Sequence, residues 1–416
     1  MKVFKFGGAS IKDAKAIENV CQIISERRKG PLLIVVSALG KTTNALENIL
    51  NLKVNKENYS KKITDLKIHH LDIVNSLFKK RADNLIDVDS LFTQLEQNLS
   101  LELPYDELYD QTVSMGEIIS STIIKEYLTY KGIDSHWLDA RKYIRTNDHY
   151  REGIVDWEIT ESLITSDIKD ILHNQIVVTQ GFIAGTKLGK ATTLGREGSD
   201  FSGAIFASCL NAESLTVWKD VPGILNADPK IDPKAKMYDE LPYNEAAEMT
   251  FYGASVIHPK TIKPLANKRI PLYVRSFIEY ESDGTVIRDC VVENILPAFI
   301  VKKDQCLLSF KVIDYSFINE ENLSLIFKKL SDLDMKINIM QNSAISFSVS
   351  IDYHSNKLNG LLEALKDSFD IRYNTGLQLI TIKNYTPSII DRYRQNKKIL
   401  LEQISRNNYR ALIQPS

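Results

Sequence analysis

Short runs rich in valine and isoleucine alternate with stretches of helical periodicity over the first part of this chain. The runs are Val3–Phe6, Leu32–Ser37, Ile176–Gln180, Ser214–Lys219 and Pro271–Val274. Because they are almost wholly apolar rather than alternating, they suit strands that are covered on both faces. Strands that alternate with helices predict an α/β domain with a largely parallel central sheet. Ligands of such sheets bind at the carboxyl ends of the strands, so we expect a site in the loops that follow these runs.

The pattern changes near residue 296, beyond which apolar and polar residues alternate, as in Phe347, Val349 and Ile351. The order strand-helix-strand-strand-helix-strand, then strand-helix-strand, is typical of a small α+β ferredoxin-like module and a shortened second copy. We therefore predict three domains, residues 1–295, 296–370 and 371–416. Alternating strands leave one sheet face for solvent or a partner. We expect these modules to be regulatory or to form an assembly surface.

Composition excludes several classes of protein. The formal net charge of −1 argues against nucleic acid as a partner. The apolar run Pro31–Leu39 is far too short to span a membrane. Lys5 and the glycines after it interrupt any signal-peptide core, so we expect a cytoplasmic location. The cysteines lie far apart and form no CxxC pair, which indicates neither a zinc site nor a disulfide framework.

The segment Lys5-Phe6-Gly7-Gly8 follows the first predicted strand and precedes a helical pattern. Glycines let the backbone approach a bulky charged group, and a helix start offers free N–H groups and the positive end of its dipole. With the ammonium group of Lys5 beside them, they indicate a phosphate-binding turn. The spacing is not that of a P-loop, so a purely structural Gly-Gly turn stays an alternative.

The segment Thr193–Asp200 concentrates candidate site residues ahead of a predicted helix at Phe201–Cys209. It combines two glycines with Arg196, Ser199 and Asp200. An arginine beside glycines suits bidentate binding of a carboxylate or a phosphate. A flexible polar loop is the alternative interpretation.

Two further segments place polar residues at element ends. The strand Ser214–Lys219 continues into Asp220 and then into Pro-Gly and Asp-Pro pairs, which indicate a nucleotide-binding edge or turn chemistry alone. Glu117, after Ser-Met-Gly, is predicted to begin a helix. An acid in a first helical turn is favoured by the helix dipole alone, so a structural role is an equal alternative.

The candidate segments follow one another along the chain as an ordered series of seven. They are Lys5-Phe6-Gly7-Gly8, Ser37-Ala38, Thr43-Asn44, Gly116-Glu117, Gly195-Arg196-Glu197-Gly198-Ser199-Asp200, Lys219-Asp220-Val221-Pro222-Gly223 and Gly253-Ala254-Ser255-Val256-Ile257-His258-Pro259. This ordered series resembles the aspartate kinases (aspartokinases) of the amino-acid kinase superfamily. The resemblance implies an amino-acid-kinase-like α/β sandwich as the catalytic domain at 1–295. The part beyond it resembles the paired ACT modules of the same enzymes, here a first module at 296–370 and a shortened one at 371–416.

The resemblance implies transfer of the γ-phosphoryl group of ATP to the side-chain carboxylate of L-aspartate. The products would be 4-phospho-L-aspartate and ADP, in the first step toward lysine, threonine and methionine. Phosphoryl transfer depends on positioning and on charge neutralisation. A carboxylate nucleophile is already ionised near neutral pH, so no general base is expected. Mg²⁺ is expected on the ATP phosphates rather than in an all-protein site.

The resemblance also assigns roles to residues. Lys5 and Asp200 are the expected catalytic residues: Lys5 would stabilise charge on the transferring group, and Asp200 would orient Lys5 or the substrate. Arg196 is expected to bind the α-carboxylate of aspartate and Glu117 its α-ammonium group, with hydroxyl contacts from Thr43 and Ser199. The expected nucleotide-binding residues are Lys5, Gly7, Gly8, Lys219, Asp220, Leu225, Lys230 and Ser255.

Several positions depart from the residues common in this family. Ala9 stands where a threonine or serine is common, which removes one hydroxyl near the phosphates. Ser255 replaces a lysine that touches ATP in many members, and Lys260 could substitute for it. Leu225 and Lys230 replace a frequent tyrosine and arginine. The sequence therefore defines the nucleotide edge less well than the aspartate pocket.

The resemblance implies that an end-product amino acid, lysine or threonine, binds the first ACT module at a subunit interface. Asn338 and Ser343 lie in the corresponding strand and loop. Asn338 stands where lysine-sensitive relatives have an aspartate that pairs with the ammonium group of the effector. A neutral amide cannot supply that charge-assisted contact, so we predict weak or altered inhibition by lysine. The shortened module predicts ACT pairing across a homodimer or higher homo-oligomer, since an incomplete sheet leaves an exposed edge.

Two other functions stay open. A sister kinase that acts on acetylglutamate, glutamate or uridylate would share the fold and the early glycines. Such kinases lack the combination of the Glu117 motif, the Arg196 loop and a pair of ACT modules. A catalytically weak amino-acid sensor is favoured by Ala9 and Ser255, although the presence of Lys5 and the other site residues weighs against it.

Overall fold

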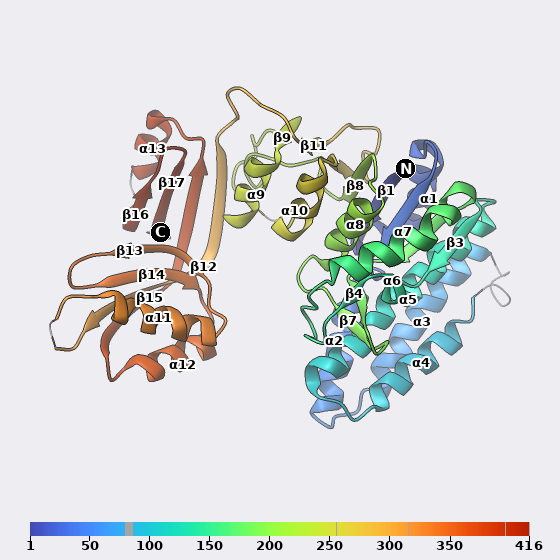
Figure 1. The fold of residues 1–416 in the computed structure, drawn as a ribbon, viewed down its shortest axis with the longest axis horizontal. Coiled ribbons are helices and arrows are strands. Elements are labelled where there is room, and N and C mark those ends of the chain that lie inside the picture. The colour runs from blue at the N-terminus through green and yellow to red at the C-terminus, as the bar shows by residue number, and fades with distance from the viewer. Residues whose placement is uncertain (80–85, 255, 315, 396, 416) are drawn as a thin grey trace. The chain divides into compact units, whose positions relative to one another are not determined.

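The computed structural model describes residues 1–79, 86–254, 256–314, 316–395 and 397–415 (Figure 1). The chain forms two compact units. The first comprises Met1–Ile224, Met237–Ala247 and Val256–Val292, and the second comprises Leu225–Lys236, Glu248–Ser255 and Glu293–Ser416.

A mostly parallel sheet, eight-stranded within the described residues, forms the centre of the first unit. Its strand order is β3-β5-β2-β1-β8-β10-β11-β9, and β10 and β11 are antiparallel to each other. Its strands are β1 (Lys2–Phe6), β2 (Leu32–Val36), β3 (Ser135–Leu138), β5 (Ile176–Gln180), β8 (Ser214–Lys219), β9 (Glu240–Pro242), β10 (Leu272–Ser276) and β11 (Thr285–Arg288). A smaller sheet contains β4 (Arg145–Thr146), β6 (Ile183–Thr186) and β7 (Ala191–Thr193).

The five strands predicted from apolar runs are confirmed: β5 and β8 have the predicted bounds, and the ends of β1, β2 and β10 shift by one or two residues. Every residue of β2 and β5 is buried. This is the result expected for inner strands of a parallel sheet, because helices cover both of their faces. The predicted α/β fold class is therefore confirmed.

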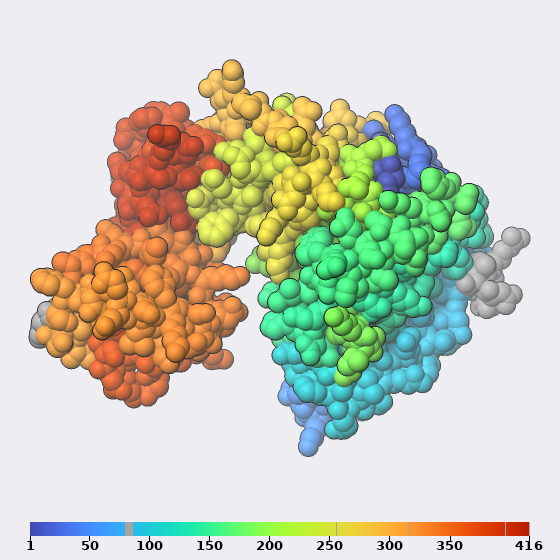
Figure 2. All heavy atoms as spheres, viewed as in Figure 1, coloured from blue at the N-terminus to red at the C-terminus, as the bar shows by residue number. Residues whose placement is uncertain are grey.

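Helices pack on this sheet and around it. They are η1 (Gly8–Ile11, a 3₁₀ turn), α1 (Ala14–Arg27), α2 (Thr42–Val54), α3 (Ser60–Phe78), α4 (Val88–Ser100), α5 (Tyr105–Tyr130), α6 (Ala140–Tyr143), α7 (Trp157–Asn174), α8 (Gly198–Cys209), α9 (Tyr243–Phe251) and α10 (Pro259–Lys268). Figure 2 shows parts of α2 to α5, coloured blue to cyan, on the surface of this unit. Helix α8 packs on β1 and β8, and this contact positions the site described below.

The second unit contains a six-stranded sheet, within the described residues, whose order is β13-β14-β12-β15-β17-β16. Each pair of neighbours in it is antiparallel. Its elements are β12 (Ala298–Val312), α11 (Glu320–Asp332), β13 (Ile337–Asn342), β14 (Phe347–Asp352), α12 (Ser355–Leu365), β15 (Phe369–Lys383), α13 (Pro387–Arg394), β16 (Lys398–Ile404) and β17 (Asn408–Gln414).

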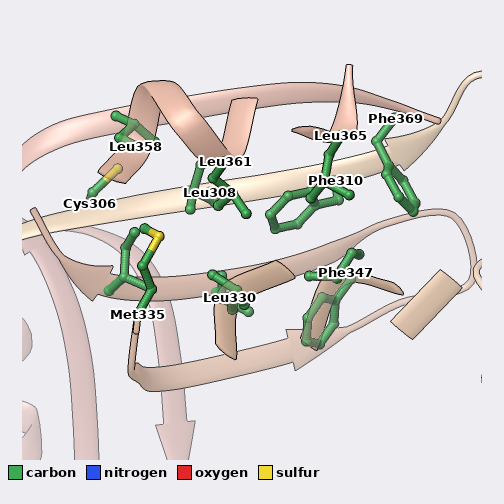
Figure 3. Close-up of a cluster of buried hydrophobic side chains, with 13 residues drawn as sticks. Cys306, Leu308, Phe310, Leu330, Met335, Phe347, Leu358, Leu361, Leu365 and Phe369 are labelled. Atoms are coloured by element: carbon green, nitrogen blue, oxygen red, sulfur yellow. The ribbon is translucent and has the colours of Figure 1, made fainter. Parts of the chain in front are cut away.

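One core cluster of this unit lies between its helices and one face of the sheet (Figure 3). Leu308 and Phe310 of β12 contribute to it, as does Phe347 of β14. Leu330 of α11 and Leu361 of α12 pack against them. The alternation of apolar residues along β12 and β14 therefore directs one face toward the helices, as the sequence predicts.

The two predicted copies share a single sheet. Strands β12 and β15 are long and pair along their whole length, so they belong to both halves. The predicted separate strand at Leu377–Ile382 is thus the end of β15, and the sequence reading missed β16. Strand β15 continues across residue 370, and the boundaries predicted at 296 and 371 stay predictions.

Within the part of the chain that the structure describes, no helix combines the length and the apolar character that crossing a membrane requires.

Candidate active site

Lys5, Lys219 and Asp200 meet at the carboxyl ends of two neighbouring strands. Strands β1 and β8 are parallel, with Phe6 opposite Trp218, so their last residues lie side by side. Lys5 Nζ is 2.7 Å from Asp200 Oδ1, and Lys219 Nζ is 3.0 Å from Asp200 Oδ2. The predicted residues Lys5, Asp200 and Lys219 are therefore brought together, in contact that would let Asp200 orient Lys5.

The electrostatics of this cluster favour ionised groups. Asp200 is almost fully buried. Burial alone would raise the pKa of its carboxyl group, but the ammonium groups of Lys5 and Lys219 hold that pKa below its usual value. Burial alone would lower the pKa of Lys219, but Asp200 and Glu197 raise it above the usual value. The result is a fixed pair of cations around one buried carboxylate.

The glycine turn lies directly beside Lys5. A Cβ atom on Gly8 would lie 2.7 Å from the carbonyl oxygen of Ala38 and 2.8 Å from that of Gly40, so only glycine lets this turn approach the loop after β2. A Cβ atom on Gly7 would lie 3.5 Å from Lys5 Nζ. The ammonium group of Lys5 therefore lies close to the backbone of the glycine turn, and phosphate binding there stays a prediction. The predicted order of strand, glycine turn and helix is confirmed, with the 3₁₀ turn η1 beginning at Gly8 and α1 following from Ala14.

Glu117 lies in the middle of α5 rather than at the start of a helix, so that prediction is wrong. Helix α5 continues through Gly116. A Cβ atom at this position would lie 3.1 Å from the Cβ of Ala38, so the glycine permits close packing of α5 against the loop after β2. Glu117 is buried, and its Oε2 atom has no hydrogen-bond partner among the described residues. Burial raises the pKa of its carboxyl group to about 8, although Ala38 and Lys5 oppose the shift.

The other three residues expected to bind aspartate lie in two first helical turns and one loop. Thr43 is in the first turn of α2, a helix that packs on α5. Ser199 is in the first turn of α8, since that helix begins at Gly198 and not at Phe201 as predicted. Arg196 is exposed in the preceding loop and has no side-chain hydrogen bond or ion pair within the described ranges. Its guanidinium group is thus available to a ligand.

The residues expected to bind the nucleotide beyond the glycine turn and Lys219 lie in different parts of the chain. Asp220 is exposed directly after β8. Leu225 and Lys230 belong to a segment of the second unit, where the Lys230 amide donates to Asp228 Oδ1 at 2.9 Å. Ser255 lies outside the described residues. Lys260, in the first turn of α10, has its Nζ atom 3.7 Å from Glu152 Oε1, so it is engaged by a carboxylate.

Asp110 supports the loop that carries Arg196, and sequence reasoning missed it. It is fully buried in α5 and accepts hydrogen bonds from Thr193 Oγ1 at 2.7 Å and from the backbone amides of Thr193 and Arg151, both at 2.9 Å. Burial raises the pKa of its carboxyl group to about 6, although these bonds oppose the shift. Asp106 and Glu107 lie one turn earlier on the same helix, so no signal in the sequence singles Asp110 out.

The expected effector residues lie in the second unit. The Asn338 side chain donates to Asp352 Oδ1 at 2.9 Å and to Gln305 Oε1 at 2.7 Å, and its oxygen accepts from Lys302 Nζ at 2.8 Å. Ser343 hydrogen-bonds Ser346 in the turn after β13. The amide of Asn338 is therefore fully engaged within the chain.

The donor sets do not suggest an all-protein metal site. Among the described residues, no group of three or more histidine, cysteine, aspartate or glutamate side chains is arranged to hold a metal ion. A Mg²⁺ ion at this site would need most of its oxygen ligands from a bound nucleotide and from water.

Comparison with known proteins relates this geometry to a family. The model of the family described as "Amino acid kinase family" matches residues 1–276. The lysine-sensitive aspartokinase 3 of Escherichia coli (strain K12) is 29% identical over 399 residues, which cover 91% of this chain and 86% of that protein. Aspartokinase 1, chloroplastic, of Arabidopsis thaliana is 30% identical over 370 residues, which cover 84% of this chain and 63% of that protein.

Solved structures of an aspartokinase are also similar to this chain. Escherichia coli aspartokinase III in complex with aspartate and ADP superposes with a TM-score of 0.85 at 25% identity, over 99% of this chain and 96% of that one. The same enzyme in complex with lysine and aspartate superposes with a TM-score of 0.80 at 26% identity, over 100% of this chain and 96% of that one.

Proposed function

The chain belongs to the amino acid kinase family, and we infer that it is an aspartate kinase. It transfers the γ-phosphoryl group of ATP to the side-chain carboxylate of L-aspartate, giving 4-phospho-L-aspartate and ADP. The observation that carries this function is the buried Lys5–Asp200–Lys219 cluster beside the glycine turn, in a fold shared with a relative that holds aspartate and ADP. The reaction is the first step toward lysine, threonine and methionine.

The cluster supports a mechanism of charge stabilisation. Lys5, held by Asp200 against the Gly7-Gly8 turn, would lie over the transferring phosphoryl group and stabilise its developing charge. Asp200 keeps two ammonium groups at fixed positions, so no reorganisation is needed when charge develops. The aspartate carboxylate attacks in its ionised form without a general base. Mg²⁺ would neutralise phosphate charge when bound with ATP.

Glu117 and Arg196 would read the α-amino-acid end of the substrate. The Oε2 atom of Glu117 is a buried acceptor without a hydrogen-bond partner among the described residues, and the α-ammonium group of aspartate would supply one. The exposed guanidinium group of Arg196 would bind the α-carboxylate bidentately. Thr43 and Ser199 would add hydroxyl contacts from their helix starts.

The nucleotide would bind along the glycine turn and the end of β8. Lys219 and the glycine turn have positions that support phosphate binding, and Asp220 follows Lys219 at the strand end. Leu225, Lys230 and Ser255 stay proposals for the adenosine end.

Regulation by an amino acid at the ACT modules is also a proposal. A related aspartokinase binds lysine. In this chain Lys302 already donates to Asn338 and lies 3.2 Å from Asp352, which supports weak or altered inhibition by lysine. We further propose a homodimer or higher homo-oligomer and a cytoplasmic location.

Release of ADP from ATP, with and without L-aspartate, tests the function. The proposal predicts turnover that depends on L-aspartate and is absent with acetylglutamate, glutamate or uridylate. Binding of an amino acid without turnover would instead support the sensor function, which Ala9 and Ser255 favour.

A further inference from the structure

A second polar pocket lies on the central sheet of the first unit. Its volume is about 450 Å³, and its floor includes Phe4, Trp218 and Tyr273. Side chains alternate between the two faces of a strand. Phe4 and Trp218 therefore lie on the face opposite their neighbours Lys5 and Lys219. The ring contacts among Phe4, Phe6 and Trp218 confirm that these side chains share this face.

The pocket carries an excess of cationic side chains. Lys2, Arg27, Lys29 and Arg275 line it, against Glu213 and Asp283. Glu213 is engaged by the N-terminal ammonium group at 2.5 Å, and the Asp283 side chain is 95% exposed at 3.5 Å from Arg275. Neither acid therefore neutralises the interior of the pocket.

Arg275 has an unused donor for an anion, whereas Arg27 donates from one of its terminal nitrogens to the Tyr280 carbonyl oxygen at 2.8 Å. Arg275 Nε is buried and has no hydrogen-bond partner among the described residues, and the same is true of Trp218 Nε1. Burial lowers the pKa of the Arg275 guanidinium group, Asp283 opposes this shift, and the charge of nearby Arg27 adds to it. A buried donor without a partner is destabilising, and a second cation beside it adds repulsion. An anion in this pocket would relieve both.

We propose that this pocket is a binding site for a small molecule that carries a phosphate or a carboxylate group. The anionic group contacts Arg275 and Arg27, and an apolar part of the ligand packs on the partly exposed Tyr273 ring, beside buried Phe4 and Trp218. A volume of about 450 Å³ lies in the range of small-ligand pockets. Because Phe4 and Trp218 directly precede Lys5 and Lys219, a ligand here touches the strand ends that hold the cluster around Asp200.

Tryptophan fluorescence tests this site without using enzyme activity. In the full chain with Trp137→Phe and Trp157→Phe, Trp218 is the remaining tryptophan. Inorganic phosphate forms one arm of the titration and succinate the other, at constant ionic strength set with chloride. Saturating ADP and L-aspartate are present throughout, so that the site around Lys5 is filled. The arm that saturates at the lower concentration identifies the anionic group.

The expected result is a saturable change in Trp218 fluorescence for at least one anion. Arg275→Gln should weaken that binding about tenfold or more, because one charge-assisted contact is lost. Arg27→Gln, at the last turn of α1, should weaken it as well, which covers the case in which the Arg275 variant folds poorly. The control Arg269→Gln, 82% exposed in its side chain and outside the pocket, should leave the binding curve unchanged. Responses that do not saturate with either anion, or that neither arginine variant changes, would overturn the proposal.

Discussion

Replacing Asp200 by asparagine removes the carboxylate that lies between two buried ammonium groups while keeping the size of the side chain. The carboxylate oxygens lie 2.7 Å from Lys5 Nζ and 3.0 Å from Lys219 Nζ. At an effective dielectric constant of about 20, each pair contributes roughly 6 kcal/mol of Coulomb energy. Desolvation offsets much of this, so we expect a net loss of about 3–5 kcal/mol in the free energy of unfolding.

Urea unfolding at neutral pH measures this loss. Glu197, whose carboxylate is 3.6 Å from Lys219 Nζ, still faces one of the cations in the variant, so Lys5 carries most of the penalty. The matched control is Asp289→Asn, an exposed ion-pair partner of Arg269, which should change stability by no more than about 0.5 kcal/mol. Turnover of the folded Asp200→Asn variant should fall about 10²–10³-fold, because Lys5 is no longer held in place.

Added phosphate gives an independent readout. An anion bound between the two lysines should restore part of the stability lost in Asp200→Asn and stabilise the wild type less. The reasoning would be refuted if Asp200→Asn lost less than about 1 kcal/mol and kept turnover within a few-fold of the wild type.

Three other predictions follow from the same structure. Lys5→Ala should lower turnover about 10²–10³-fold, and circular dichroism should show that the variant is folded. Near-normal turnover would show that Lys5 is not catalytic. Because burial raises the pKa of Glu117 from 4.5 to about 8, the unfolded chain ionises this group first, so wild-type stability should fall as pH rises through that interval. Urea midpoints of Glu117→Gln should lack this fall, and parallel pH profiles would contradict the assignment. Burial lowers the pKa of His70 from 6.5 to about 4, so its contribution, about 3 kcal/mol, is complete above pH 6.5 and lost as pH falls toward 4. His70→Asn should flatten that part of the acid unfolding profile, and an unchanged profile would show that other groups cause it.

The sequence predicts the elements that bury whole runs of residues. Strands β2 and β5 are apolar throughout, and their positions follow directly from that pattern. The short strands β3 and β7 carry polar residues and could not be read in the same way, because pairing with neighbours rather than local pattern determines them. In the second unit, register shifts in β12 between Lys302 and Leu307 let one long strand serve two halves, which no local signal in the sequence indicates.

The site divides in the same way. The order of the motifs predicts that Lys5, Asp200 and Lys219 are site residues. Parallel pairing of β1 with β8 explains why Lys5 and Lys219 lie close together. The position of Glu117 within α5 was mispredicted because Gly116 resembles a helix break, whereas it is a packing contact. Asp110 has no motif, since its role depends on a loop far along the chain. The anionic-ligand pocket around Arg275 likewise combines residues from three strands and a helix end, which only the fold brings together.

Transfer of the γ-phosphoryl group to the side-chain carboxylate of aspartate is the central chemical step, and trapping its product tests it directly. Hydroxylamine converts an acyl phosphate into a hydroxamate, so the purified chain can be incubated with ATP, Mg²⁺, L-aspartate and hydroxylamine and the product separated from its isomer. We predict aspartate 4-hydroxamate formed in equal amount to ADP, and loss of both with Lys5→Ala. ADP formation without hydroxamate, or formation of the 1-hydroxamate instead, would contradict the claim.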